Sequence, residues 1–206
     1  MRNMPSRMGV KVSDLTAADL LVLCAPRHGT AASWLLGSIP RSATRTSPCP
    51  VVVVVRGAPR TGIRRILVGI DSSTASIAAA DWACHEADLH RAAVVVIHAW
   101  RKTTHSKRSG RERHLAHADL ESALDLVVDR CRQRTLAPVV GQLVDGEPAS
   151  ILNEASADFD LIAVGSRGRT GFKPLLFGSG ALAVAGEAQC PVAILHPQPT
   201  HRSDTQ

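Results

Sequence analysis

From residue 64 onward, short runs of β-branched and aliphatic residues alternate with longer runs whose apolar residues recur every three or four positions. This alternation is typical of βαβ units, in which successive strands lie parallel in one sheet and helices cover both faces. Aromatic residues make up only 3% of the chain and Tyr is absent, so Val, Leu, Ile and Ala must form the core, as they do in buried parallel sheets. The expected fold class is therefore α/β, with a five-stranded parallel sheet of the Rossmann-like type.

The elements of this sheet can be placed by residue range. The pattern predicts strands over 66–71, 93–99, 139–144, 160–164 and 191–195, and helices over 74–90, around 120–131, over 148–157 and over 179–188. For the helix over 74–90, a cap among residues 72–74 is expected, and Ala78, Trp82 and Leu89 are expected on the buried stripe. Pro148 suits the first turn of its helix, where no intrahelical N–H is needed.

A basic stretch over 101–113 separates the second predicted strand from the clearest helix. It holds six basic residues, Gly110 and two serines, which is typical of a surface loop. Such a loop either steers an anionic ligand inward or is a solvated connection. In the helix that follows, Leu120, Leu124 and Cys131 recur at helical spacing and are expected on one buried face.

An internal repeat accounts for the length of 206 residues. A shift of 141 positions without a gap places Asp19-Leu20 on Asp160-Leu161 and Cys49-Pro50-Val51 on Cys190-Pro191-Val192. Residues 1–57 are therefore expected to hold a partial strand-helix-strand copy of the unit over 62–200, with 201–206 as a disordered tail.

The apolar strand at 51–55 would be an aggregation hazard as an open edge. Its natural partner is the equivalent strand over 192–195. We expect these two strands to pair, either within one chain or by self-association of two chains.

The clearest functional motif follows the fourth predicted strand. Residues 165–179 read GSRGRTGFKPLLFGS and fit the spacing G-x2-G-x9-G-[ST]. Gly165 and Gly168 are expected to leave room for a ligand, while Gly178 and Ser179 open a helix whose free N–H groups favour phosphate.

Three further residues complete the motif's predicted chemistry. Arg167 can contact phosphates or ribose, and the Ser179 hydroxyl can add a hydrogen bond. Gly180, in the first helical turn, should loosen that helix end at a cost of about 1 kcal/mol at most. The alternative is a glycine-rich connection that only turns the chain. In the partial copy, Cys24 and Arg27 replace the first two glycines and obstruct such a loop, so no nucleotide site is expected there.

The intact spacing of this motif resembles the ATP-binding signature of the universal stress protein family, and the resemblance covers all five strands of 62–200. It implies an ATP-binding protein with a regulatory role in the stress response, with slow or no hydrolysis. It also implies that Asp71, at the end of the first strand, contacts the nucleoside or a metal such as Mg²⁺, and that backbone at Ala99 lines the adenine pocket. From the residues alone, Asp71 equally suits a cap of the next helix. Here Ser72-Ser73 follows Asp71, where Gly-Ser is common in the family.

Two other functional hypotheses are weighed against a binding protein. An ATP-cleaving or adenylyl-transferring enzyme is disfavoured, because the sequence has no P-loop lysine motif and no evident nucleophile beside a base. A dimerisation module with an empty pocket is the third. His98, at a strand end, suits a hydrogen-bonded core residue better than a general base.

Charge and cysteine content narrow the partners and the location. A formal net charge of +6 suits an anionic partner, but nucleic acid is disfavoured because stacking aromatics and zinc-finger spacing are lacking. No apolar run approaches the roughly 18 residues of a membrane helix, and residues 1–7 lead into no apolar signal core, so a cytoplasmic location is expected. The five cysteines show no CxxC spacing and are expected to be reduced and mostly buried.

Overall fold

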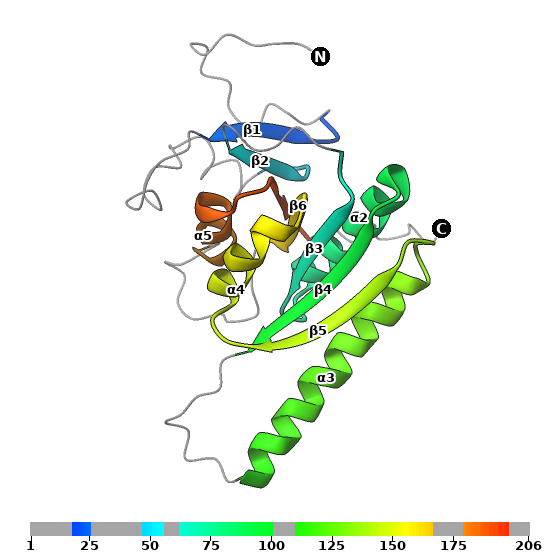
Figure 1. Cartoon of the computed structure of the whole chain (residues 1–206), viewed down its shortest axis with the longest axis vertical. Coiled ribbons are helices and arrows are strands. Elements are labelled where there is room, and N and C mark those ends of the chain that lie inside the picture. Colours follow the sequence, from blue (N-terminus) through cyan, green and yellow to red (C-terminus); the bar gives the residue numbers. More distant parts are fainter. Residues whose placement is uncertain (1–17, 26–46, 56–61, 101–109, 167–178, 198–206) are drawn as a thin grey trace, which may run out of the picture.

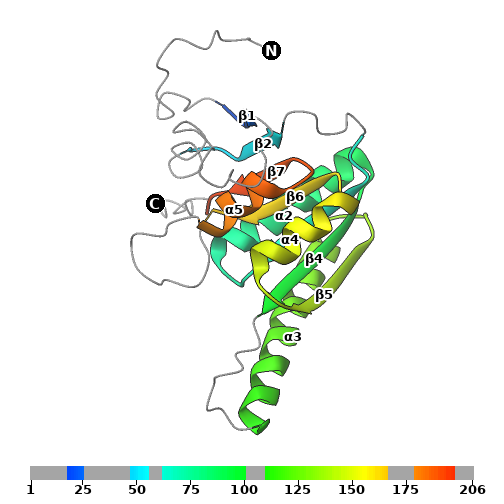
Figure 2. The ribbon, with the colours of Figure 1, turned by 60° about the vertical axis from the view of Figure 1, so that its left-hand side comes forward.

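The computed structural model describes residues 18–25, 47–55, 62–100, 110–166 and 179–197. The described strands form one seven-stranded sheet in the order β1-β2-β7-β6-β3-β4-β5 (Figures 1 and 2). Its strands are β1 (Leu21–Ala25), β2 (Val51–Val55), β3 (Arg65–Ile70), β4 (Ala93–Trp100), β5 (Val139–Asp145), β6 (Leu161–Gly165) and β7 (Val192–Leu195). Its helices are α2 (Thr74–His90), α3 (Gly110–Arg132), α4 (Pro148–Ala155) and α5 (Ser179–Glu187), with the 3-10 helix η3 (Ser156–Asp158).

The five strands predicted for 62–200 are all present and mutually parallel, which confirms the α/β class. The sheet is larger than predicted, because β1 and β2 extend it beyond β7. β1 and β2 are parallel to each other, whereas β2 runs antiparallel to β7, with Val51 opposite Ile194 and Val53 opposite Val192. The predicted pairing of these two strands therefore occurs within one chain. Since β2 and β7 have neighbours on both sides, neither leaves an edge for self-association.

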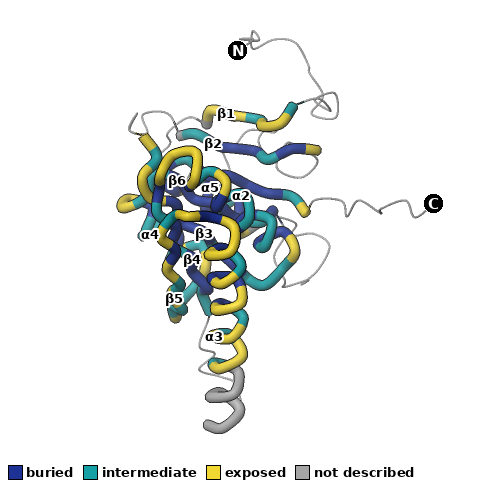
Figure 3. Tube along the Cα trace, turned by 90° about the vertical axis from the view of Figure 1, so that its right-hand side faces the viewer, coloured by how far each residue is buried: buried dark blue, intermediate teal, exposed yellow. Residues whose placement is uncertain are grey.

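Two apolar cores cover the two faces of the sheet. The first lies between the sheet and helices α2 and α3, and the second between the sheet and helices α4 and α5. Figure 3 shows the buried strands at the centre and the exposed side of α3 projecting beyond them. β1 is the outer edge strand, and Val22 on it is 56% exposed.

Helix α2 has the predicted bounds but buries a different stripe. Leu89 is 64% exposed, so the prediction is wrong for this residue, whereas Ala78 and Trp82 are half-buried and Trp82 packs against the core. The buried residues are small: Ala75, Ser76, Ala79, Ala80, Ala83, Cys84 and Ala87. A face without bulky side chains lets the helix backbone approach the sheet closely. The prediction missed this face because it relied on the spacing of large apolar residues.

Other element bounds also differ from prediction. Helix α3 begins at Gly110, so the basic segment over 101–113 is not a loop throughout. Arg and Glu are good helix formers, and a run of charge does not stop a helix. Helix α4 ends at Ala155 and continues as η3, so its predicted extension to 157 is a tighter helical turn. The predicted helix over 179–188 ends one residue earlier, at Glu187.

An ion-pair cluster joins α3 to α2. The Asp81 carboxylate accepts hydrogen bonds of 2.7 Å from both Nε and Nη2 of Arg130, and Arg134 Nε lies 3.2 Å from its Oδ1. These groups are partly exposed, so solvent screening limits their stabilisation. Within the described ranges, no helix has the length and apolar character needed to cross a membrane.

Candidate functional site

The carboxyl ends of β3 and β6 lie side by side at the centre of the sheet. β3 pairs with β4 on one side and with β6 on the other, so the strand order reverses between β3 and β6. In open α/β sheets, ligands bind outside the carboxyl ends of strands at such a reversal. The structure therefore brings Asp71, which follows β3, to the same edge as Gly165, which ends β6.

Asp71 lies at the entrance to α2 but is not its N-cap. The N-cap is Ser73, whose hydroxyl accepts a hydrogen bond of 3.2 Å from the Ser76 N–H. Asp71 Oδ1 accepts a hydrogen bond of 3.1 Å from the Ser73 N–H, and the Asp71 N–H donates to Ser76 Oγ at 3.3 Å. Asp71 thus fixes the turn between β3 and α2 and leaves the capping to Ser73.

Ser72 adopts a backbone conformation that usually favours glycine. Its φ is +62°, in the left-handed region that non-glycine residues rarely occupy. Ser72 thus adopts, at a position after the strand, a conformation that a glycine would adopt at less cost. Its Oγ is buried and has no hydrogen-bond partner among the described residues.

Gly165 has a packing role that the sequence did not predict. A Cβ at this position would lie 2.7 Å from both the Ala75 carbonyl carbon and the Ser76 N, and 2.9 Å from the Ala75 Cβ. The space that a Cβ would need is therefore taken by the first turn of α2. The close contact still places the helix N-terminus and its free N–H groups at this edge.

The glycine motif connects this edge to another helix. Its first glycine ends β6 and its last residue, Ser179, begins α5, as predicted. Arg167, Gly168 and Gly178 lie outside the described residues. The motif thus runs from a strand end to a helix start, which is the context that a phosphate-binding loop requires.

Gly180, in the first turn of α5, is exposed and a Cβ there would meet nothing within 4 Å. We expect Gly180→Ala to raise the free energy of unfolding by about 0.5–1 kcal/mol, because alanine has the higher helix propensity and no clash opposes it. Urea denaturation followed by circular dichroism measures this change. A decrease in stability would contradict an open helical site.

Ala99, the residue predicted at the adenine pocket, is the second-last residue of β4. It is half-buried on the α4 side of the sheet. The preceding residue His98 is 5% exposed, in agreement with its interpretation as a core residue.

Sequence reasoning missed Ser166, the residue directly after β6. Its N–H donates a hydrogen bond of 2.7 Å to the Leu195 carbonyl oxygen, and the residue is 5% exposed. Its hydroxyl, like that of Ser72, has no hydrogen-bond partner among described residues. Buried hydroxyls are normally paired, so two unpaired ones at the same edge fit a polar ligand. Their position within two residues of a strand end was the available signal.

The buried Cys190 thiol is unsuited to nucleophilic chemistry. Cys24 is exposed, and the other four cysteines are free and buried, as predicted. Burial raises the pKa of Cys190 to about 12, so this thiol stays protonated at neutral pH. No cluster of three or more potential metal ligands (His, Cys, Asp or Glu) occurs among the described residues.

The sequence is similar to those of known proteins. The sequence model described as the Universal stress protein family matches residues 2–55 and 62–196. Universal stress protein Rv2005c of Mycobacterium tuberculosis (strain ATCC 25618 / H37Rv) is 32% identical over 181 residues, which are 86% of this chain and 61% of the relative. Universal stress protein Rv2624c of the same strain is 35% identical over 142 residues, 68% of this chain and 50% of the relative. The chain thus spans about half to three-fifths of the length of these relatives.

Solved structures show the same fold. A universal stress protein from Archaeoglobus fulgidus DSM 4304 superimposes with a TM-score of 0.66 at 18% identity, over 90% of this chain and 65% of that one. A universal stress protein crystallised in complex with cAMP superimposes with a TM-score of 0.55 at 23% identity, over 66% of this chain and 99% of that one.

Proposed function

Because the chain belongs to the universal stress protein family, we propose that it binds an adenine nucleotide, ATP in particular, at the carboxyl edge of β3 and β6. The observation that carries the proposal is the position of the glycine motif, which begins at the end of β6 and ends at the first residue of α5. This edge is where the strand order reverses, and ligands of open α/β sheets bind at such points.

The residues of the motif divide the proposed binding between them. Gly168 and Gly178 let the backbone approach the phosphates closely, and the first turn of α5 at Ser179 offers free N–H groups and a favourable dipole. Arg167 supplies charge to the phosphates, and the Ser179 hydroxyl adds a hydrogen bond. A polyphosphate would lie between the end of β6 and the start of α5.

We assign the ribose and the base of the nucleotide to residues at the carboxyl ends of β3 and β4. Asp71 is placed to accept a hydrogen bond from the ribose or to hold Mg²⁺ with the phosphates, and backbone at Ala99 lines the base pocket. The hydroxyls of Ser72 and Ser166, which lack partners among described residues, are further groups that a polar ligand satisfies. The similar structure in complex with cAMP supports an adenine nucleotide as the ligand class.

The proposed role is regulatory, with slow or no hydrolysis, in a cytoplasmic stress response. Phosphoryl transfer needs cations placed on the transferred group and a residue that positions the nucleophile. The sequence has no P-loop lysine motif to supply such a cation. The site is therefore proposed to retain the nucleotide without cleaving it. A partner protein would respond to whether the nucleotide is bound.

Isothermal calorimetry with ATP tests the proposal. We expect one ATP per chain, because Cys24 and Arg27 replace the first two motif glycines in the other copy. Gly168→Val should weaken binding at least tenfold, since a branched side chain keeps the backbone from the phosphates. The matched control is Gly62→Val, at an exposed glycine with open space around it. Absence of ATP binding by the wild-type chain would overturn the proposal, and rapid stoichiometric cleavage of labelled ATP would overturn its regulatory part.

A further inference from the structure

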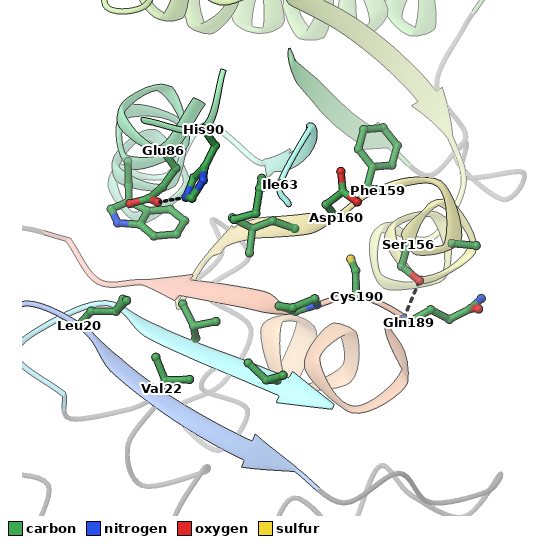
Figure 4. A pocket seen from close by; sticks show the side chains of 16 residues that line it. Leu20, Val22, Ile63, Glu86, His90, Ser156, Phe159, Asp160, Gln189 and Cys190 are labelled. Carbon is green, nitrogen blue, oxygen red and sulfur yellow. Dashed lines mark hydrogen bonds and ion pairs between the residues drawn. The ribbon is translucent and has the colours of Figure 1, made fainter. Parts of the chain in front are cut away.

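A cavity lies beside the start of β6, at the end of this strand that is opposite to the proposed nucleotide site. It has a volume of about 490 Å³, within the range of small-molecule sites. It is lined where β6 and β7 begin, by Asp160, Leu161 and Pro191, and by the last turns of α2 (Figure 4). The nucleotide site is proposed at the carboxyl ends of β3 and β6, so Asp160 and that site lie at opposite ends of β6.

One wall of this cavity is an apolar sheet face. Leu20, Val22, Val52 and Val54, from β1, β2 and the residue before β1, line it on the side of the sheet that faces α2. Leu20 is 43% and Val22 is 56% exposed, although β-branched and aliphatic residues of a parallel pair are usually covered on both faces. This wall suits the apolar body of a ligand.

The opposite wall is a stripe of α2. Trp82, Glu86 and His90 are spaced by four residues and therefore lie on one side of the helix, and all three line the cavity. Glu86 Oε2 lies 3.5 Å from His90 Nε2, as the dashed line in Figure 4 shows. The other oxygen, Oε1, makes no hydrogen bond to a described residue. The carboxylate thus has an unused acceptor beside an indole ring.

Asp160 supplies a second carboxylate, on the far side of Ile63 from Glu86 in Figure 4. Its Oδ2 accepts hydrogen bonds of 2.8 Å and 2.9 Å from the N–H groups of Arg64 and Arg65. These bonds fix the side chain, and Oδ1 receives no hydrogen bond from the described residues. A positioned carboxylate with one acceptor unused is suited to bind a cation.

The charge of the lining decides the ligand class. No Lys or Arg is among the described residues that line the cavity, and its one basic side chain, His90, already faces Glu86. The Glu86 carboxylate beside the Trp82 indole favours an ammonium group over an anion, whereas the Arg65 guanidinium lies 4.5 Å from the centre of the Phe159 ring on the Asp160 side of the cavity. Asp160 also contributes to the raised pKa of Cys190 on the same wall, so that thiol stays protonated and the site is suited to reversible binding.

We propose that this cavity binds a small organic amine, with its ammonium group at Glu86 beside the Trp82 indole and its aliphatic body against Val22 and Val54. The site is distinct from the proposed nucleotide site and does not depend on it. Its ligand class is opposite in charge to a nucleotide.

Calorimetric titration of the full chain with hexylammonium, hexanoate and hexanol tests this assignment, because the three probes share one aliphatic body. Hexylammonium should bind one to one, and hexanoate and hexanol at least tenfold more weakly. Equal binding of hexanol would overturn the role of the Glu86 carboxylate, and absence of hexylammonium binding would overturn the site.

Variants locate the bound amine. Glu86→Gln should weaken hexylammonium binding about threefold to tenfold, as expected for one partly exposed charge pair, and Asp160→Asn, on the far side of Ile63, should weaken it less. The control is Glu121→Gln on α3, where Glu121 forms a similar i,i+4 pair with His117 outside the cavity. Unchanged affinity in Glu86→Gln would contradict the proposal. ATP affinity should be the same in all three, so loss of either kind of binding can be assigned to its own site.

Discussion

Gly165→Ala should lower the free energy of unfolding by about 2–3 kcal/mol, the cost of overpacking a well-filled core. The added Cβ would lie 2.7 Å from two backbone atoms of the first turn of α2. A flexible side chain could move away, but the helix backbone can do so only by displacing α2 from β6. Urea denaturation followed by circular dichroism measures the loss.

Gly180→Ala, at the other end of the same motif, is the matched control because it adds the same methyl group in open space. The two alanine variants should change stability in opposite directions. An unchanged urea midpoint for Gly165→Ala would show that α2 can move away from β6 at little cost in free energy. The glycine would then be explained by ligand binding alone.

Val53→Asp should destabilise the chain by about 4 kcal/mol, because it places a carboxylate at a fully buried position without a partner. Val53 is 0% exposed, lies between β1 and β7, and packs into the core that α5 and β6 share. Since β2 shares that core, the loss should appear in a single unfolding transition of the whole described sheet.

The control for this substitution is Val22→Asp on the neighbouring strand. Val22 is 56% exposed, so its carboxylate stays hydrated and the expected change is below about 1 kcal/mol. Thermal unfolding of both variants makes the comparison. Equal thermal unfolding midpoints for Val53→Asp and wild type would contradict the packing of β1 and β2 into one sheet with the other strands.

The sequence predicted strands and their neighbours correctly where the apolar pattern alone decides the structure. β2 is the run of five valines over 51–55, and the repeat correctly predicted its pairing with β7, because an apolar strand needs neighbours on both sides. It could not indicate that β2 runs antiparallel to β7 within a seven-stranded sheet, since strand direction depends on how two segments far apart in the chain meet. The alanine face of α2 was missed because large residues dominate apolar periodicity.

For the candidate site, the sequence predicted the motif's context but not all of its packing. That Gly165 ends β6 and Ser179 begins α5 followed from pattern and spacing. That the space beside Gly165 is filled by Ala75 depends on two segments far apart in the chain. The left-handed conformation of Ser72 was hidden because serine rarely adopts it.

Hydrogen exchange with and without saturating ATP is the most direct test of where the nucleotide binds. We predict slower exchange at residues 71–73, in the segment between β6 and α5 and in the first turn of α5, with no change in β1 and β2. ATP binding accompanied by protection only around Glu86 and Asp160 would contradict a nucleotide site at the carboxyl ends of β3 and β6.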